Sequence, residues 1–404
     1  MKKYVIIGVM LYSLCAKSAT PSYEKITLEN HILYKYDFDI SKDSIHLSRA
    51  LDDGKLALED VYSFAKRHNA KAAFNAGYFH IGHARRGLPA NFLFTKDNIF
   101  TPKLQKSAIY KTKNGPIKFD IISSSPYILG EKIGKIEIEG INQKAQEGIR
   151  VYTSSYWTST LTEQSSYEIV VSSGIVQEIN INGNSKIPEG PRSQNFVIAV
   201  DEKNAAQLKT IEIGSKIEYG ADLSVNNSLI NNEEIEWMIA GSDLLIKDSK
   251  IPKEITNIEN ESAFRDQEFA RTSLCQISNT KYSVIVADHN IVKDIYDIKL
   301  KEMITQLRKN GLNREVILEM KTKDLIEEWN KNEQKREDVS YGMSLYELAS
   351  YLAKLKCKNA INLDGGGSST LVVEGRIVNN PTGAENIIVE GKNIREVGDI
   401  LYIK

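Results

Sequence analysis

The sequence contains few cysteines and has almost no net charge. Its 404 residues include 3 Cys and 9 Pro, and 52 Lys and Arg stand against 53 Asp and Glu, for a formal net charge of -1. So few cysteines exclude a disulfide-dense scaffold, and the balanced charge argues against binding of nucleic acid through excess cations. Because 41% of the residues are hydrophobic, the chain is also unlike a disordered one. We therefore expect a globular protein without a nucleic-acid partner.

The first residues have the pattern of a secretory signal peptide. Lys2 and Lys3 precede an apolar run over residues 4–15, and the segment after it, up to Ala19, holds small residues beside one lysine. The run is shorter than the about 20 apolar residues that a membrane-spanning helix needs. We predict a signal peptide over residues 1–18 and an exported, periplasmic or secreted chain without stable membrane insertion; a buried N-terminal strand or helix is the alternative.

Two cysteines, Cys275 and Cys357, follow the predicted signal peptide. An oxidising compartment permits a disulfide bond between them. The sequence gives no distance between the two side chains, and we expect two buried thiols rather than a bond.

Strand patterns dominate the predicted secondary structure. Residues 23–50 alternate apolar and polar positions in places, residues 90–235 contain many short apolar segments between turns, and residues 281–287 form a strong strand pattern. Apolar residues at helical spacing predict a helix over 57–68. A second helix is predicted to begin at Ser344, which has a glutamate three positions later, as in a capping box.

Residues 291–340 differ in composition from the rest of the chain. They hold 22 charged residues among 50, and apolar residues recur at helical spacing from Leu300 to Leu307. We predict one or two inserted amphipathic helices with a solvated charged face; a helix that docks a partner is the alternative. The fold class is therefore α+β, with a large mixed, strand-rich sheet core, a few packed helices and this insertion. We expect one main domain over 60–404, with residues 19–59 as strands packed on it.

The most informative segment lies between short strand patterns at 360–363 and 371–373. It contains, in order, Asp364, Gly365, Gly366, Gly367, Ser368, Ser369 and Thr370. Three consecutive glycines lose much backbone entropy on folding, so we expect a requirement for them, either a tight turn or a ligand close to backbone N–H groups. The three hydroxyls can bond phosphate or sugar oxygens. A hairpin turn is the alternative; the pattern is not a P-loop, because no Gly-Lys-Ser/Thr follows.

Five motifs in order resemble those of the phosphodiester glycosidase family. They span roughly residues 70–404 and are Phe74 to Phe79, Ala240 to Leu245, Ala270 to Ser273, Tyr341 to Ala349, and the segment that begins at Asp364. Asn380 and Arg395 stand where the family carries a late Asn and Arg. The resemblance implies a hydrolase that cleaves the bond between the anomeric carbon of a sugar and a phosphodiester.

The resemblance and the chemistry of the residue types together imply roles for the matched residues. The leaving phosphate monoester has a second pKa of about 6, so the site needs a phosphate clamp and a carboxylate more than a strong general acid. We expect Asp364 as the carboxylate, Arg271 as the phosphate clamp, and Asn75 as the group that orients Asp364 or bonds a sugar hydroxyl. The expected substrate-binding residues are Gly77, Gly241, Ser242, Thr272, Gly365, Gly366, Gly367, Ser368, Ser369, Thr370, Asn380 and Arg395.

Several assignments stay open at this point. Asp243 or Asp288 could supply a second carboxylate, or could cap a turn. The six histidines show no metal-ligand spacing, so no cofactor is predicted, although a divalent cation beside Asp364 and phosphate stays an alternative. The expected partner is a phosphate-linked glycan or sugar-nucleotide substrate. The alternative function is that of a non-catalytic glycan-binding or exopolysaccharide-assembly protein with the same fold.

Overall fold

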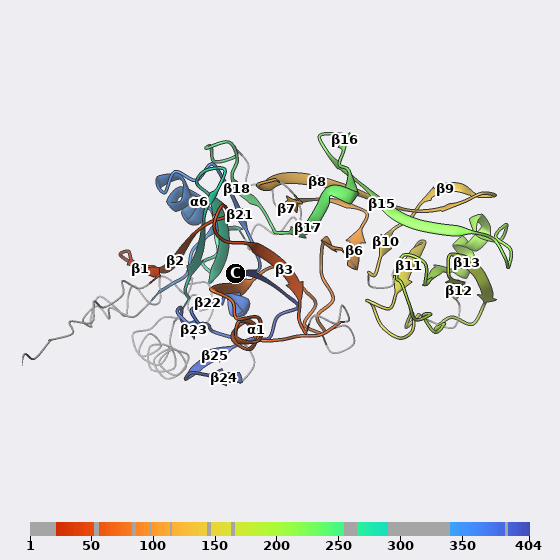
Figure 1. The fold of residues 1–404 in the computed structure, drawn as a ribbon, viewed down its shortest axis with the longest axis horizontal. Coiled ribbons are helices and arrows are strands. Elements are labelled where there is room, and N and C mark those ends of the chain that lie inside the picture. The colour runs from red at the N-terminus through yellow and green to blue at the C-terminus, as the bar shows by residue number, and fades with distance from the viewer. Residues whose placement is uncertain are drawn as a thin grey trace, which may run out of the picture.

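The computed structural model describes residues 22–51, 56–82, 86–96, 98–113, 115–143, 147–162, 166–253, 265–289, 340–383 and 387–404. The predicted signal peptide lies outside these residues, as does the predicted insertion over 291–340 except for Ser340. In this described part, no helix is long and apolar enough to cross a membrane. Figure 1 shows an elongated molecule with a sandwich of sheets at one end and a second group of strands at the other.

Two antiparallel sheets face each other in the part that we call the sandwich. Both sheets contribute to one large core, in which Phe74 and Leu401 from one sheet join Leu274 and Ile361 from the other. The first sheet runs in the order β1 (Tyr23–Thr27), β2 (Ile32–Asp39), β20 (Lys281–Ala287), β19 (Arg271–Gln276), β21 (Asn359–Asn362), β18 (Leu244–Ile246). The second runs in the order β23 (Arg376–Ile377), β22 (Leu371–Val373), β4 (Ala72–Asn75), β26 (Asp399–Ile403), β3 (Ile45–Arg49).

One helix covers the outer face of each sheet, so the sandwich has four layers. Helix α6 (Leu345–Lys354) buries its apolar stripe against the first sheet, and α1 (Val61–His68) buries Phe64 against the second. The capping box of Ser344 and Glu347 is confirmed at the start of α6. Each helix therefore seals a sheet face that would otherwise expose apolar side chains to water.

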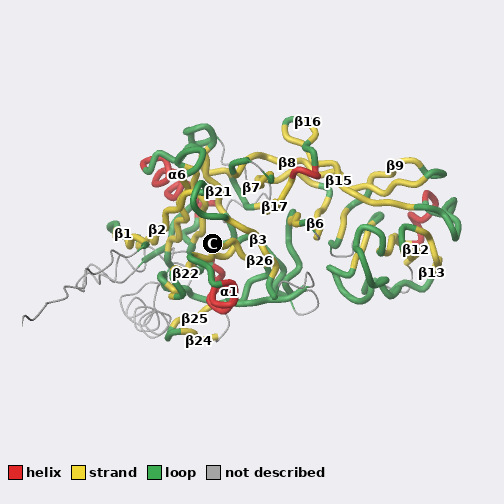
Figure 2. Tube along the Cα trace, in the orientation of Figure 1, coloured by secondary structure: helices red, strands yellow, loops and turns green. Residues whose placement is uncertain are grey.

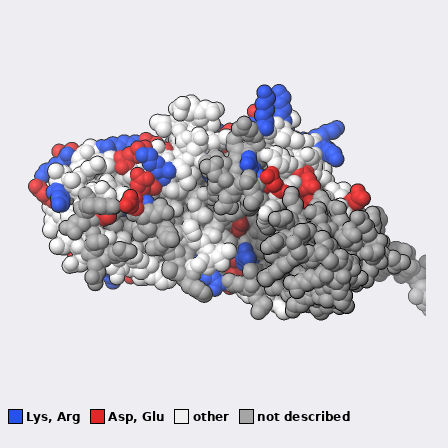
Figure 3. Space-filling view, turned by 180° about the vertical axis from the view of Figure 1, so that it is seen from behind, with Lys and Arg blue, Asp and Glu red and all other residues white. Residues whose placement is uncertain are grey.

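A third sheet leads away from the sandwich. Its outer strands, from β9 (Gly134–Glu137) to β14 (Phe196–Asp201), form the part that we call the distal lobe (Figure 1). Lys and Arg side chains lie among Asp and Glu over this lobe in Figure 3. The sheet runs in the order β13 (Ile175–Asn180), β12 (Ser166–Ser172), β14 (Phe196–Asp201), β11 (Arg150–Thr153), β10 (Gly140–Ile141), β6 (Asn98–Pro102), β5 (Leu93–Thr95), β17 (Ile235–Ala240), β7 (Leu104–Thr112), β8 (Ile117–Gly130), β15 (Ile217–Val225), β16 (Ser228–Leu229), and β9 (Gly134–Glu137) pairs with β8.

The fold is mostly β, with fewer helices than the predicted α+β class implies. Strands dominate Figure 2, and the described residues hold α1, α6 and three short 3-10 helices. The strand pairs are antiparallel apart from the parallel pair β10 and β11, so the third sheet is mixed as predicted. The remaining elements are the hairpin of β24 (Ile387–Val389) with β25 (Lys392–Ile394) and the 3-10 helices η2 (Glu202–Gln207), η3 (Asn232–Glu234) and η4 (Gly366–Ser368).

Helix α1 begins four residues later than the sequence predicts. The apolar spacing suggested a start at residue 57, but the helix begins at Val61, because the Asp60 side chain accepts a hydrogen bond from the Ser63 amide and caps it. Glu59 lies before the cap and pairs with Val397 as a β-bridge. Tertiary pairing therefore decided this boundary.

The expectation of two buried thiols is wrong. Cys275 and Cys357 form a disulfide bond, with Cα atoms 5.6 Å apart. Cys275 lies on β19, which pairs with β21, and Cys357 lies just before β21. Two residues separated by 82 positions meet only because these strands are neighbours, and the sequence alone does not specify that pairing.

Candidate functional site

The predicted site residues converge where strands of the two sandwich sheets end. Asn75 is the last residue of β4, Thr272 lies near the start of β19, and Asp364 follows β21 by two positions. Hydrogen bonds tie these ends together: the Leu363 amide donates to the Thr272 carbonyl at 2.8 Å, and the Asp364 amide to the Ala76 carbonyl at 2.9 Å. The glycine-rich segment is therefore held by both sheets.

Asn75 is the central connector of this site. Its side chain is fully buried, and its Nδ2 donates to the Asp364 carbonyl at 2.6 Å. Its Oδ1 accepts from Thr272 Oγ1 at 2.8 Å and from the Thr370 amide at 3.1 Å. One amide side chain thus fixes both flanks of the glycine-rich segment. Its burial leaves orientation of Asp364, rather than contact with a sugar hydroxyl, as the role that the geometry supports.

The Asp364 carboxyl is half-buried at the entrance to this segment. Burial raises its pKa to about 7, and the negative charge of Asp399 acts in the same direction. The Ser368 hydroxyl, the Gly365 amide and the positive charge of Arg395 oppose this rise; the Gly365 amide donates to Asp364 Oδ1 at 2.8 Å. A carboxyl with this pKa gains and loses a proton near neutral pH.

The three glycines serve different purposes. A Cβ on Gly365 would lie 2.7 Å from the Ala270 carbonyl oxygen, and Gly366 has a φ of +58°, which favours glycine. The Gly366 amide donates to the Ala270 carbonyl at 2.7 Å. The Gly365 amide donates to Asp364 in the same way. Two of the three glycine amides that we expected to bind a ligand therefore donate to other groups of the protein instead.

Gly367 makes room for Arg395. A Cβ on Gly367 would lie 2.7 Å from Arg395 Nη2, so the guanidinium lies directly against the glycine backbone. Arg395 is partly exposed, and its charge acts on Asp364. A cation and an ionisable carboxyl, both on partly exposed residues, therefore lie near each other beside the glycine-rich segment.

Arg271 has a different environment from the one predicted for a phosphate clamp. Its side chain is fully buried and donates to the Met343 carbonyl through Nε and to the Gln267 carbonyl through Nη2, both at 2.9 Å. Burial lowers its pKa to about 10, while Tyr78 and Asp243 interact with it favourably. The guanidinium holds two loop segments beside β19. Asp243, one candidate for the second carboxylate, thus faces this buried arginine.

Other predicted residues build the frame of the site. A Cβ on Gly241 would lie 2.3 Å from the Asn362 carbonyl oxygen, so this glycine is required by a close backbone approach. Ser242 Oγ accepts from Asn362 Nδ2 at 2.8 Å, and the Tyr78 hydroxyl donates to the Leu363 carbonyl at 2.9 Å. Gly241 and Ser242 therefore position the end of β21 rather than a ligand.

Ser368, Ser369 and Thr370 are buried with their hydroxyls turned into the protein. Asn380 is exposed, and its amide donates to the carboxylate of Asp288 at 2.9 Å. Burial raises the pKa of Asp288 to about 6 against these hydrogen bonds. Asp288, the other candidate for the second carboxylate, therefore caps the turn at Asn380.

Sequence reasoning missed Asp399, which lies beside Gly77. Asp399 is the first residue of β26 and is fully buried, and a Cβ on Gly77 would lie 3.3 Å from its Oδ1. Burial raises its pKa to about 6, whereas Arg49 and the Gly77 amide lower it. Its place just before a strand pattern gave no signal of function, although its charge acts on Asp364.

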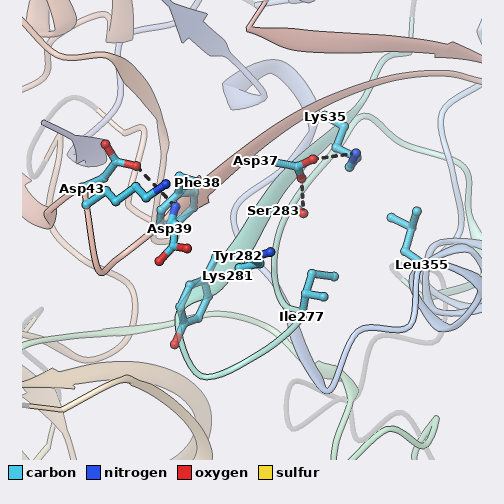
Figure 4. A pocket seen from close by; sticks show the side chains of 11 residues that line it. Lys35, Asp37, Phe38, Asp39, Asp43, Ile277, Lys281, Tyr282, Ser283 and Leu355 are labelled. Carbon is cyan, nitrogen blue, oxygen red and sulfur yellow. Dashed lines mark hydrogen bonds and ion pairs between the residues drawn. The ribbon is translucent and has the colours of Figure 1, made fainter.

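A surface pocket of about 620 Å³ lies elsewhere on the first sheet. Figure 4 shows it between β2, β20 and the end of α6, with Asp37 between Lys35 and Ser283. It contains no predicted site residue. Within the described ranges, no group of three or more His, Cys, Asp or Glu could hold a metal ion.

The comparisons with known proteins bear on this site. Residues 332–404, which include the glycine-rich segment and Arg395, match the model of the NAGPA phosphodiester glycosidase family. The predicted family resemblance is confirmed. A 41-residue stretch of the chain is 49% identical to human N-acetylglucosamine-1-phosphodiester alpha-N-acetylglucosaminidase, but this covers only 10% of the chain and 8% of the human protein.

Two other similarities cover more of the chain. An uncharacterized protein of Rickettsia conorii is 24% identical over 250 residues, which are 60% of this chain and 84% of that protein. A hypothetical protein from Synechocystis has a similar fold, with a TM-score of 0.69 and 18% identity over 94% of this chain. The chain spans 61% of the Synechocystis structure. The phosphodiester glycosidase resemblance thus has its sequence signature at the C-terminal end, within a fold shared along most of the chain.

Proposed function

We propose that this protein is an exported phosphodiester glycosidase. It hydrolyses the bond between the anomeric carbon of a sugar and a phosphodiester, in a phosphate-linked glycan or a nucleotide sugar. The observation that carries the proposal is that Arg395 lies against Gly367 and acts through its charge on the nearby carboxyl of Asp364. A carboxyl that exchanges protons near neutral pH thus lies near a cation suited to phosphate.

Asp364 acts as the general base in the proposed reaction. Its carboxylate takes one proton from a water molecule, the water oxygen forms a bond to the anomeric carbon, and the bond from that carbon to the phosphate oxygen breaks. A general base is most effective when its pKa lies near the working pH, which fits the value of about 7. The proton then passes to solvent.

Arg395 binds the phosphate in this reaction, in place of the buried Arg271. The phosphate leaves as a monoester that keeps the bonding electron pair, and its second pKa of about 6 removes the need for a strong acid. The guanidinium can donate two parallel hydrogen bonds to the phosphate oxygens as charge develops. Asn75 holds the segment that carries Asp364, and Arg271 holds the neighbouring segments at Gln267 and Met343.

Two features support the exported location. The signal-peptide pattern over residues 1–18 directs a chain to the secretory route. The disulfide of Cys275 and Cys357 is of the kind that persists outside the reducing cytosol.

The test is turnover by the purified mature chain. The substrates are both anomers of glucose and N-acetylglucosamine 1-(methyl phosphate), together with UDP-N-acetylglucosamine, because the human relative is named for that sugar. We expect release of reducing sugar from at least one substrate. Asp364→Asn is expected to reduce kcat by at least about a thousandfold with binding retained, because it removes the base but keeps the shape.

Asp222→Asn is the matched control for this test. Asp222 lies on β15 and pairs at the surface with Lys135, so its loss should leave kcat unchanged. Binding of these sugar phosphates without any release of reducing sugar would contradict the proposal and favour the glycan-binding alternative. Inversion of the anomeric centre is the stereochemistry expected from direct attack by water.

A further inference from the structure

The proposed reaction leaves the buried carboxyl of Asp399 without a role. Strand β26 pairs with β4 so that Ile400 lies opposite Asn75. The Ala76 amide donates to the Asp399 carbonyl at 3.2 Å, and the Ala76 carbonyl accepts from the Asp364 amide at 2.9 Å. One residue therefore links the backbones of the two aspartates directly.

The surroundings of Asp399 fix its carboxyl in place. Arg49 from β3 lies with Nη1 at 3.7 Å from Asp399 Oδ2, and both side chains are buried. Arg49 is held in turn by its Nη2, which donates to the Gly87 carbonyl at 2.8 Å, and by the ring of Phe100. On the other side, Gly77 leaves no Cβ to push the carboxyl away. Burying such an ion pair costs desolvation energy and is weak evidence of a stabilising role.

Among the described residues, the groups that act on the two carboxyls lie on β3, after β4, after β25 and in the glycine-rich segment. Asp399 faces Arg49 from β3 and the Gly77 amide after β4, and its charge acts on Asp364. Asp364 faces Arg395 after β25, together with the Ser368 hydroxyl and the Gly365 amide of its own segment. Among these groups, Asp399 is the negative charge that acts on Asp364, and it is shielded from solvent.

We propose that Asp399 is a positioning residue for the candidate site, which acts on Asp364 through its negative charge and is held in place by Arg49. This role adds a residue to the proposed active site. Only its effect on activity rests on the proposed function. A nearby negative charge disfavours ionisation of a carboxyl, so Asp399 keeps Asp364 protonated to a higher pH. The pair then titrates as coupled groups rather than as two independent acids.

The test measures the titration of Asp364 directly. Mature protein labelled with 13C at the aspartate carboxyls is titrated by NMR, and the Asp364 and Asp399 signals are assigned by their loss in Asp364→Asn and Asp399→Asn. We expect Asp399→Asn to lower the midpoint of Asp364 by about one pH unit. The ascending limb of the profile of kcat/KM against pH should move to lower pH by the same amount.

Asp288→Asn is the matched control, because Asp288 is also a buried aspartate with a raised pKa but does not face Asp364. It should leave the midpoint of Asp364 where it is. The same interaction can be measured from the other side, in a variant that keeps Asp399. Because the coupling is reciprocal, Asp364→Asn should lower the titration midpoint of Asp399 by the same amount. This measurement covers the case in which Asp399→Asn fails to fold, and the Asp399 carboxyl signal is then assigned through its bonded backbone nuclei in protein labelled with 13C and 15N.

An unchanged Asp364 midpoint in folded Asp399→Asn, or an unchanged Asp399 midpoint in Asp364→Asn, overturns the inference. The NMR measurement requires no turnover. If the midpoints are coupled but no substrate is hydrolysed, the proposed function is wrong and the inference about Asp399 stands. If substrate is hydrolysed but the midpoints are independent, the inference is wrong and the proposed function stands.

Discussion

The distal lobe and the sandwich each hold an acidic side chain, and they hold it in opposite ways. In the distal lobe, Glu168 on β12 is fully buried, and its carboxylate accepts hydrogen bonds from Thr160, Thr162 and the Ser185 amide at 2.6–2.7 Å. In the sandwich, Asp364 is half-buried, and its pKa is raised to about 7. Three donors suit a carboxylate with a structural role, whereas a carboxyl poised to exchange its proton is suited to chemistry.

The largest expected effect is on stability, and it tests whether the sandwich unfolds independently of the distal lobe. The double substitution Cys275→Ser and Cys357→Ser removes the covalent link across 82 residues. The chain-entropy model gives a loss of about 4 kcal/mol in the free energy of unfolding, measured by urea denaturation. Hydrogen exchange should rise in β19 and β21 while β12 and β14 keep their protection. Equal loss of protection in both regions would break the comparison, because the two would then unfold as one unit.

The next effect concerns the structural carboxylate itself. Glu168→Gln places an amide group against hydroxyl and amide donors, so at least one buried hydrogen bond is lost, at a cost of about 2 kcal/mol in the free energy of unfolding. Thermal and urea denaturation measure this loss, and kcat/KM of the folded variant should stay within about twofold. Asp364→Asn is expected to show the reverse result, with activity lost and stability kept. A folded Glu168→Gln protein as inactive as Asp364→Asn would contradict the distinction.

The smallest expected effect is on substrate binding, and it tests the role of Arg395. Gly367→Ala places a Cβ 2.7 Å from the end of the Arg395 side chain, which is flexible and can move aside. We expect KM to rise about tenfold, a loss of about 1.4 kcal/mol in substrate binding, with the free energy of unfolding almost unchanged. Gly82→Ala is the control, because a Cβ there meets nothing within 4 Å. An unchanged KM would remove Arg395 from the phosphate site.

Local signals in the sequence predicted local structure well. The capping box at Ser344 and the strand over 281–287 are confirmed, because both depend on neighbouring residues. The disulfide and the burial of Arg271 could not be predicted, since each depends on strands that pair across long stretches of chain. The same reason hid Asp399: a single aspartate before a strand resembles a turn residue until β26 pairs with β4 and places it beside Gly77.

The disulfide also has a topological consequence. Cys275 and Cys357 lie on either side of the charged segment at 291–340, so this segment belongs to a covalently closed loop. A protease that cuts the chain anywhere between the two cysteines would leave both fragments joined in one molecule. The strand that leads to Asp364 would stay tethered to β19 after such a cut. Processing of the segment and retention of the glycine-rich motif are therefore compatible in one oxidised chain.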